Sequence, residues 1–252
     1  MFVGIDIGGT NIRVVTGPTV GEIVLSNEIS IDTPSSYKDG IQALTEIIKK
    51  LEVQVDGIAI GLPGSVNSDG ELTGSFHLKD WVGHPLAKTL AAEFSTRVTV
   101  RNDAEMGALG EAYCGNWGEA DFLYLTWGTG FGVAQARWHD REVIVDRPEN
   151  REAIYELDRS IGGNNLLQRY GLQAASLDDE QWNEVMIELT DSLPKLAKQY
   201  QHDTIVLSGG VSIKQTKRIE AALQSLKTPN VYLTKLKGKA GLYGALALLK
   251  NK

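Results

Sequence analysis

The chain has 252 residues, 42% of them hydrophobic, and a formal net charge of −7 at pH 7. This length and apolar content predict a globular protein of one large domain or two lobes. Acidic and basic residues are mixed along the chain, which argues against a nucleic-acid partner, and the single cysteine excludes an intrachain disulfide and a multi-cysteine zinc site.

The hydropathy of the chain indicates no membrane association. No apolar run approaches the roughly 20 residues that a membrane-spanning helix needs. The chain begins with "MFVGIDIGG", which enters a strand at once, so we expect no signal peptide and no DNA-binding helical module before it. These features predict a cytoplasmic protein that acts on small molecules.

The segment "VGIDIGGTNIRVV" (residues 3–15) carries a glycine turn between two apolar strands, expected at 2–6 and 11–16. Because strand-forming residues follow the glycines, the pattern predicts a β-hairpin and excludes a Rossmann turn, which needs a helix there. Glycines at a hairpin tip let backbone N–H groups approach an anion closely. Asp6 lies where a carboxylate could hold Mg²⁺ on a phosphate, directly or through water.

The rest of the first half alternates strands and helices, as in a mixed α/β lobe. A strand that ends in Gly-Leu-Pro-Gly predicts a sharp turn at the carboxyl edge of a sheet, where the ligands of α/β proteins lie. The expected elements are strand 21–31, helix 37–52, strand 56–64, helix 84–94 and a strand that runs into a helix over 97–115.

Asn102 and Asp103 lie at the junction of that last strand and helix. Asp103 has two interpretations: a helix N-cap, for which Asn and Asp are favoured, or a general base that accepts a hydroxyl proton during phosphoryl transfer. Asn102 offers both a donor and an acceptor, which suits a sugar hydroxyl. Glu111 is expected on the helix surface or in a salt bridge that closes two lobes.

The second half repeats this plan around another glycine turn, "LYLTWGTGFGVAQA" (residues 123–136). One such turn between strands is ordinarily only a tight turn. Two of them, far apart in one chain, predict two lobes that hold one polyphosphate between them. The remaining expected elements are a polar stretch at 137–158, helices 164–171 and 179–200, the latter kinked or broken near Pro194, a buried strand with a glycine turn over 203–212, and a closing helix 238–250.

Six short motifs follow one another along the chain: "DIGGTNIR", "GLPG", "NDA" with "ALGE", "GTGFG", "VLSGG" and "GLYGA". Each is weak alone, but the ordered set resembles the ROK (repressor/open-reading-frame/kinase) family of sugar kinases, within the actin–hexokinase superfamily. The resemblance covers most of the chain, with a gap at residues 137–155. It implies a two-lobed actin-like ATPase fold, which is a duplicated ribonuclease H-like α/β architecture with an inter-lobe cleft.

The resemblance also implies an activity: glucokinase-like, ATP- and Mg²⁺-dependent phosphorylation of a hexose or hexose derivative by a homodimer. It places the sugar site and the first phosphate motif in an N-terminal lobe of residues 1–115, onto which a C-terminal helix within 238–252 packs back. The second phosphate motif and the adenosine motif then lie in a C-terminal lobe of residues 116–237.

By position, the resemblance assigns roles to single residues. Asp103 matches the catalytic base, Asn102 and Gly64 match sugar contacts, and Asp6 would hold Mg²⁺ through water. The nucleotide-binding positions are Asp6, Gly8, Gly9, Thr10 and Asn11 in the first phosphate motif, Gly128, Thr129, Gly130 and Gly132 in the second, and Gly209 and Gly210 in the adenosine motif.

The sugar half departs from the family pattern. The E-x-G-H segment whose Glu and His hold the sugar is absent, and so is the neighbouring cysteine-rich zinc motif, so no zinc site is expected. Glu156 matches a Glu that follows the zinc cysteines, and Glu149 and Glu152 are candidates to replace the missing pair. His77, in "HLKDW", stands where the family has a sugar-binding Asn.

Other functions stay open. The missing Glu and His favour a sugar- or nucleotide-binding regulator with little catalysis, whereas Asp6 and Asp103 favour an enzyme. A kinase for an N-acetylhexosamine or another polyol is a further alternative, and polyphosphate could replace ATP as the donor. The acidic net charge disfavours a transcriptional repressor.

Overall fold

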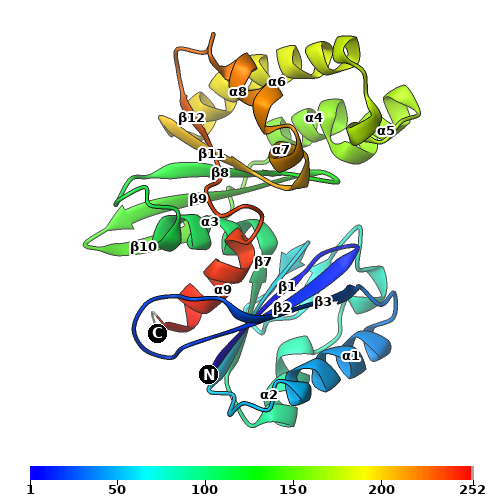
Figure 1. The fold of residues 1–252 in the computed structure, drawn as a ribbon, viewed down its shortest axis with the longest axis vertical. Helices are drawn as coiled ribbons and strands as arrows, with labels where there is room; N and C mark the ends of the chain where they lie inside the picture. Colours follow the sequence, from blue (N-terminus) through cyan, green and yellow to red (C-terminus); the bar gives the residue numbers. More distant parts are fainter. Residues whose placement is uncertain (251–252) are drawn as a thin grey trace. The chain divides into compact units, whose positions relative to one another are not determined.

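The computed structural model describes residues 1–250, and the chain divides into two compact units (Figure 1). Unit 1 consists of residues 1–114 and the segment from residue 239 onward, and unit 2 consists of residues 115–238. The last two residues of the expected C-terminal segment 238–252 lie outside the described residues. Each unit has its own five-stranded sheet and its own hydrophobic core.

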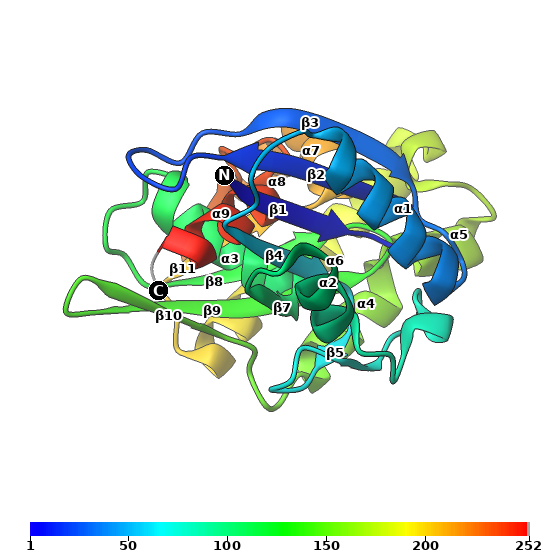
Figure 2. The same ribbon diagram turned by 90° about the horizontal axis from the view of Figure 1, so that it is seen from below.

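Unit 1 is built on a sheet in the order β3-β2-β1-β4-β7 (Figure 2). β1 pairs antiparallel with β2 and parallel with β4, and β7 continues the parallel part. The third strand is shorter than expected because residues 21–25 form a loop that begins at Gly21 with a φ of 78°. The elements of unit 1 are β1 (Phe2–Ile7), β2 (Asn11–Gly17), β3 (Ser26–Asp32), α1 (Tyr37–Lys50), β4 (Gly57–Leu62), β5 (Ser65–Val66), β6 (Leu72–Gly74), the short helix η1 (Lys79–Trp81), α2 (Leu86–Phe94), β7 (Val98–Asn102), α3 (Asp103–Cys114) and α9 (Ala240–Lys250).

One face of this sheet carries the apolar core. Successive side chains of a strand point to opposite faces, and Val3, Ile5 and Ile7 of β1 therefore share one face. They belong to a buried cluster that includes Leu44 of α1 and Leu90 of α2. The apolar stripes of α1 and α2 thus cover the face on which the branched residues of β1 lie.

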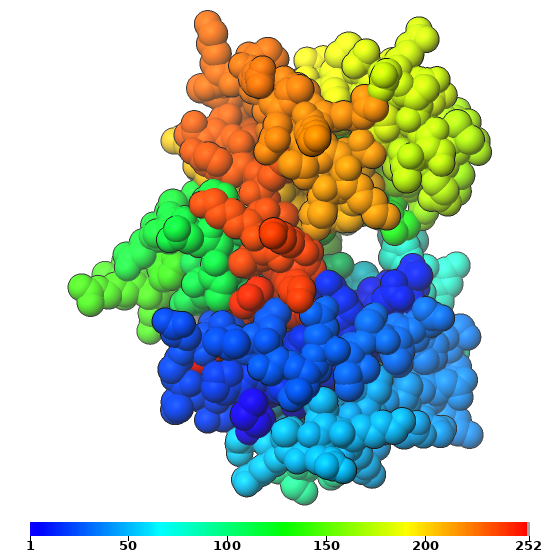
Figure 3. All heavy atoms as spheres, in the orientation of Figure 1, coloured from blue at the N-terminus to red at the C-terminus, as the bar shows by residue number. Residues whose placement is uncertain are grey.

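The opposite face of the sheet is lined by glycine, and α3 and α9 lie on it. A Cβ atom added to Gly4 or Gly57 would lie 3.2 or 3.1 Å from side chains of α9, and one added to Gly61 would lie 3.0 Å from Met106 of α3. Figure 3 shows α9, in red, beside the blue N-terminal strands of the same unit. Glycine therefore lets both helices approach the sheet backbone closely.

α3 and α9 also cross at glycines. A Cβ on Gly110 would lie 2.0 Å from the carbonyl oxygen of Ala240, and one on Gly244 would lie 1.8 Å from the carbonyl oxygen of Met106. Most residues of α3 are buried, including Glu111, which has no exposed surface. The expectation of a surface position for Glu111 is therefore wrong, because the helix is covered on more than one side.

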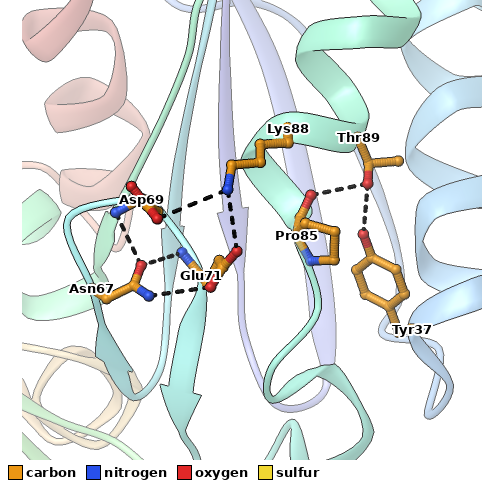
Figure 4. A network of polar contacts seen from close by, with 7 residues as sticks. All are labelled: Tyr37, Asn67, Asp69, Glu71, Pro85, Lys88 and Thr89. Carbon is orange, nitrogen blue, oxygen red and sulfur yellow. Dashed lines mark hydrogen bonds and ion pairs between the residues drawn. The ribbon is translucent and has the colours of Figure 1, made fainter.

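A short hairpin, β5–β6, follows the Gly-Leu-Pro-Gly turn and is tied to α2 (Figure 4). Asn67 Oδ1 accepts hydrogen bonds from the amides of Asp69 and Glu71, at 3.0 and 2.9 Å, which closes the hairpin tip. Lys88 Nζ of α2 lies 3.8 Å from the Asp69 carboxylate and 3.7 Å from the Glu71 carboxylate. These contacts join the hairpin tip to the surface of α2.

Unit 2 repeats the sheet of unit 1, in the order β10-β9-β8-β11-β12, again with two antiparallel pairs followed by two parallel pairs. Two sheets of one topology are what a duplicated ribonuclease H-like fold predicts. The elements of unit 2 are β8 (Phe122–Trp127), β9 (Phe131–His139), β10 (Glu142–Asp146), α4 (Glu152–Ile161), α5 (Gly163–Tyr170), the short helix η2 (Ala174–Ser176), α6 (Asp179–Tyr200), β11 (Thr204–Ser208), α7 (Gly210–Lys214), α8 (Thr216–Leu223) and β12 (Asn230–Leu233).

The structure refines two expectations for unit 2. The polar stretch 137–158 contains the end of β9, all of β10 and most of α4. The sequence marks β10 only weakly because it is an edge strand whose alternate side chains are exposed. α6 does not break at Pro194, since Leu193 and Leu196 beside the proline are buried and hold the helix against the core.

His202 lies between α6 and β11 and is 5% exposed. Burial lowers the pKa of this imidazole below its ordinary value of 6.5, and the Arg137 guanidinium lowers it further. The carboxylates of Asp121, Asp146 and Asp203 act in the opposite direction and do not reverse the shift. The folded structure therefore favours the neutral form of His202.

Replacing Gly244 by Ala should destabilise the protein, because the added methyl would meet the backbone of Met106 and no flexible side chain can move aside. Overpacking of this kind costs about 1–3 kcal/mol of the free energy of unfolding, which urea denaturation measures. Gly74→Ala is the control, since a Cβ there would meet no atom within 4 Å. Equal stability of the two variants would contradict the close helix crossing.

The stability should also depend on pH through His202. The unfolded chain protonates this residue near pH 6.5 and the folded chain only at lower pH, so the free energy of unfolding should fall as the pH drops below 6.5. The slope should reach at most about 1.4 kcal/mol per pH unit. Urea denaturation at about pH 7.5 and about pH 5.5 measures it. His202→Asn should remove this contribution, and an unchanged pH dependence in that variant would refute the assignment.

Candidate functional site

The candidate site residues of unit 1 follow three neighbouring parallel strands. β1, β4 and β7 pair in register, with Asp6 opposite Gly61 and Gly61 opposite Arg101. The segments that leave these strands therefore start at the same edge of the sheet: the first glycine loop, the turn at Gly64, and the junction at Asn102. This is the edge at which ligands of α/β sheets bind.

The first glycine loop joins β1 to β2, and the predicted β-hairpin is confirmed. The Gly8 amide donates to Asn11 O at 2.8 Å, which closes the turn. Thr33 then ties the loop back: its hydroxyl donates to Gly8 O at 2.7 Å and its amide donates to Thr10 O at 2.8 Å. Among residues 1–250, no hydrogen bond uses the amides of Gly9 and Thr10. The loop therefore presents two backbone donors that an anion can take.

Asp6 lies near the end of β1, opposite Arg13 of β2, and the two side chains form an ion pair. The Asp6 side chain is 19% exposed. A Cβ on Gly241 would lie 3.4 Å from its carboxylate, so the absence of a side chain there leaves space beside it. A single carboxylate fits Mg²⁺ that is held mainly by phosphate oxygens and water.

Asn102 is 4% exposed, and its side chain bonds to the protein backbone at both ends. Nδ2 donates to Gly64 O at 2.8 Å, and Oδ1 accepts from the Ala104 amide at 3.0 Å. Gly64 has a φ of 139°, and a Cβ there would lie 2.3 Å from Gly74 O of the β5–β6 hairpin. Asn102 thus joins the end of β7 to the turn that follows β4.

Asp103 is the first residue of α3 and is half-buried. Its Oδ1 accepts a hydrogen bond from the Ala104 amide at 2.9 Å, which orients the carboxylate. Asn102, the residue before the helix, accepts from this same amide, so both side chains bond to the first turn of α3. The general-base interpretation of Asp103 stays a prediction.

His77 joins the first glycine loop to the turn at Gly64. A Cβ on Gly9 would lie 3.0 Å from His77 Cβ, so the imidazole packs on the loop. The His77 amide donates to Ser75 Oγ at 3.2 Å, and that hydroxyl donates to Pro63 O at 2.7 Å. Unit 1 therefore brings together the predicted residues Gly9, His77, Gly64, Asn102 and Asp103 through short contacts.

Sequence reasoning missed Ser75 and Thr33, because a single hydroxyl in a loop gives no pattern.

In unit 2 the predicted residues again follow neighbouring strand ends. β8 and β11 are parallel, with Thr126 opposite Ser208, so the second glycine loop and Gly209 start at the same edge. Gly209 has a φ of 97°, and a Cβ there would lie 2.4 Å from Trp127 O. A Cβ on Gly210, the first residue of α7, would meet nothing within 4 Å, so space is open beside the backbone there.

The second glycine loop joins β8 to β9, as the sequence predicts, and Gly132 pairs with Thr126 inside that hairpin. The Gly128 amide donates to Gly130 O at 2.9 Å. In the part of the chain that the structure describes, the amides of Thr129 and Gly130 donate to no group. The tip therefore resembles that of the first loop, with two successive donors available to an anion.

Trp127, at the end of β8, has a structural role. It is fully buried, its Nε1 donates to Ile161 O at 2.8 Å, and its ring stacks on Phe131 at a centroid distance of 5.3 Å. The ring therefore fixes both ends of the second glycine loop against α4, because Trp127 precedes the loop and Phe131 follows it.

The acidic candidates of α4 lie elsewhere. Glu156 is exposed on α4, Glu152 pairs with Arg159 on the same helix, and Glu149 lies in the loop before it. Residues two apart on a helix do not face the same way, so Glu156 points away from the side on which Asp158 contacts the second glycine loop.

Asp158 Oδ1 accepts a hydrogen bond from the Phe131 amide at 2.8 Å. Sequence reasoning missed Asp158, because no local pattern distinguishes it from the other acids of the helix.

Two features are absent from residues 1–250. These residues contain no group of three or more His, Cys, Asp or Glu side chains placed to hold a metal ion by themselves. No helix in this range combines the length and the apolar character that crossing a membrane requires.

The chain is similar in sequence to a known protein family and to several of its members. A sequence model of the ROK family matches residues 2–137. The chain is 30% identical over 141 residues to a xylose repressor of Caldicellulosiruptor bescii and 35% identical over 145 residues to a glucokinase of Halalkalibacterium halodurans. Each match covers 52% of this chain, but only 35% of the repressor and 42% of the glucokinase.

A solved structure matches the whole chain. The ROK family glucokinase of Streptomyces griseus, in complex with glucose and AMPPNP, superposes with a TM-score of 0.81 at 20% identity and covers 100% of this chain and 99% of that one. This similarity confirms the predicted two-lobed actin-like α/β fold. Together with the match of the family model over more than half of the sequence, it gives the conclusion that the chain belongs to the ROK family.

Proposed function

We propose that this chain is an ATP-dependent hexose kinase that uses Asp103 as its general base. The observation that carries the proposal is the common sheet edge of unit 1, where Asp103 follows β7 and the first glycine loop follows β1. β1 and β7 are separated in the sheet by one strand, β4, so the ends of β1 and β7 lie about 10 Å apart. That spacing suits a sugar hydroxyl and a phosphoryl group between a carboxylate and a phosphate-binding loop.

In the proposed reaction, a sugar hydroxyl oxygen attacks the γ-phosphorus, the bond to the ADP oxygen breaks, and Asp103 accepts the hydroxyl proton. The Ala104 amide, bonded to Asp103 Oδ1, keeps the carboxylate in one orientation. The unbonded amides of the two glycine loops bind phosphate oxygens. When bound, Mg²⁺ neutralises phosphate charge, and Asp6 would hold it through water.

The proposed sugar contacts are Gly64, His77, Asn102 and Glu156. Asn102 has one Nδ2 hydrogen and one Oδ1 lone pair left after its two backbone bonds, so it can make at most a limited contact with a hydroxyl. The glucokinase relatives support a hexose as acceptor. The proposal also includes a cytoplasmic homodimer that binds no nucleic acid, and the mass in solution from light scattering tests the dimer.

A sugar- or nucleotide-binding regulator with little catalysis is the second candidate. The observation that favours it is the engagement of Asn102 within the protein, which reduces the sugar contacts that unit 1 can supply. The similarity to a xylose repressor supports it as well. The two functions differ in one measurable property, since only the kinase needs Asp103 for turnover.

The test is ADP release from Mg·ATP by the purified protein with glucose, mannose, fructose, N-acetylglucosamine, N-acetylmannosamine or no sugar, and with polyphosphate as an alternative donor. One sugar should stimulate ADP release. Asp103→Asn should lower kcat about 100- to 10,000-fold with little change in the KM for ATP, because the amide cannot accept the proton.

Asp69→Asn, at the exposed hairpin tip of the same unit, is the control and should keep wild-type turnover. Near wild-type turnover of Asp103→Asn would show that Asp103 is not the base. Tight ATP binding without sugar-dependent ADP release would instead favour the regulator.

A further inference from the structure

We propose that Asp158 is a positioning residue that holds the second glycine loop, residues 128–130, in its phosphate-binding shape. The inference rests on the proposed function, since it concerns how that loop receives the nucleotide. Asp158 does not belong to any of the six motifs, and it lies two residues beyond Glu156 on α4.

The side chain of Asp158 occupies space that two glycines leave open. A Cβ added to Gly130 would lie 2.8 Å from Asp158 Oδ1, and one added to Gly162 would lie 2.2 Å from the same oxygen. That oxygen accepts the Phe131 amide at 2.8 Å. The carboxylate therefore sits directly behind the loop and is bonded to the first residue after its tip.

The backbone around Asp158 supports the same loop. Asp158 O accepts from the Gly162 amide and from Asn165 Nδ2, both at 2.8 Å. The start of α5 then reaches the loop carbonyls: the Gly163 amide donates to Gly128 O at 3.1 Å, and the Asn164 amide donates to Thr129 O at 2.7 Å. The α4–α5 corner thus fixes the loop from behind.

The backbone groups of the loop divide into bonded and unbonded ones. The carbonyls of residues 128 and 129 and the Phe131 amide bond to the α4–α5 corner. The amides of Thr129 and Gly130 bond to no described residue. A loop that these bonds already hold in one conformation offers its two remaining amide donors to a phosphate without the entropy cost of becoming ordered. Loss of the Asp158 bond should therefore weaken nucleotide binding more than sugar binding.

The charge of Asp158 is not what this role needs. A carboxylate beside a phosphate site repels the ligand, so its value lies in accepting the hydrogen bond from the Phe131 amide. Asp158→Asn can keep that acceptor and removes the charge. An anchor should tolerate this change, whereas a metal ligand or an acid–base group should not.

The experiment compares Asp158→Ala and Asp158→Asn with wild type in two readouts. Backbone hydrogen exchange of the peptide that contains Phe131 reports on the loop without any assumption about activity. Calorimetric binding of AMPPNP with Mg²⁺, and the KM values for ATP and for the sugar, report on the ligand. Asp191→Ala and Asp191→Asn, which change an exposed carboxylate on α6 of the same unit, are the matched controls.

In Asp158→Ala we expect the Phe131 amide to exchange about tenfold faster and the dissociation constant of AMPPNP and the KM for ATP to rise about tenfold, with the sugar KM within about twofold of wild type. Asp158→Asn should restore both readouts to near wild type. Asp158→Ser, whose hydroxyl is too short to reach the amide, replaces Asp158→Ala if the latter does not fold.

Unchanged exchange in Asp158→Ala would overturn the anchor. Equal loss of binding in Asp158→Asn and Asp158→Ala would also overturn it and would indicate a role of the charge. If the protein phosphorylates no sugar, the proposed function fails, but faster exchange and weaker AMPPNP binding in Asp158→Ala alone would still support the anchor.

Discussion

The in-register parallel pairing of β1, β4 and β7 is the constraint on which the candidate site depends. It aligns Asp6, Gly61 and Arg101 across the sheet, so three segments far apart in the sequence leave it at one edge. The glycine-lined face beneath this edge lets α3 pack closely, which fixes the start of the helix and with it Asp103. A shift of one residue in the register would turn each of these side chains to the opposite face.

The two glycine loops have the same design but different supports. In each, a neighbouring segment binds the loop carbonyls and leaves two successive amides at the tip. Thr33 after β3 does this in unit 1, and the α4–α5 corner does it in unit 2. Both units share the sheet topology, but different elements support their glycine loops. The residues that support one loop therefore have no counterpart in the sequence of the other unit.

Glycine has two separate uses in this chain. In the loops it keeps backbone donors accessible, and at the crossing of α3 and α9 it lets two backbones meet where any side chain would collide. Asn102 likewise has two uses. The same amide group caps α3 and holds Gly64, so the residue expected to bind a sugar is first of all part of the scaffold that places Asp103.

Periodicity and turn residues are local signals, so they were enough to predict α/β lobes, both hairpins and the position of Asp103 between a strand and a helix, while the actin-like fold followed from the resemblance of the ordered motifs. Which residues support the site depends on packing between distant segments. Asn102 reaches Gly64 across 38 residues and Phe131 reaches Asp158 across 27. The burial of Glu111 and the continuity of α6 through Pro194 likewise depend on what packs against each helix. Contacts between distant elements leave no periodic trace in the chain, so local patterns cannot predict them.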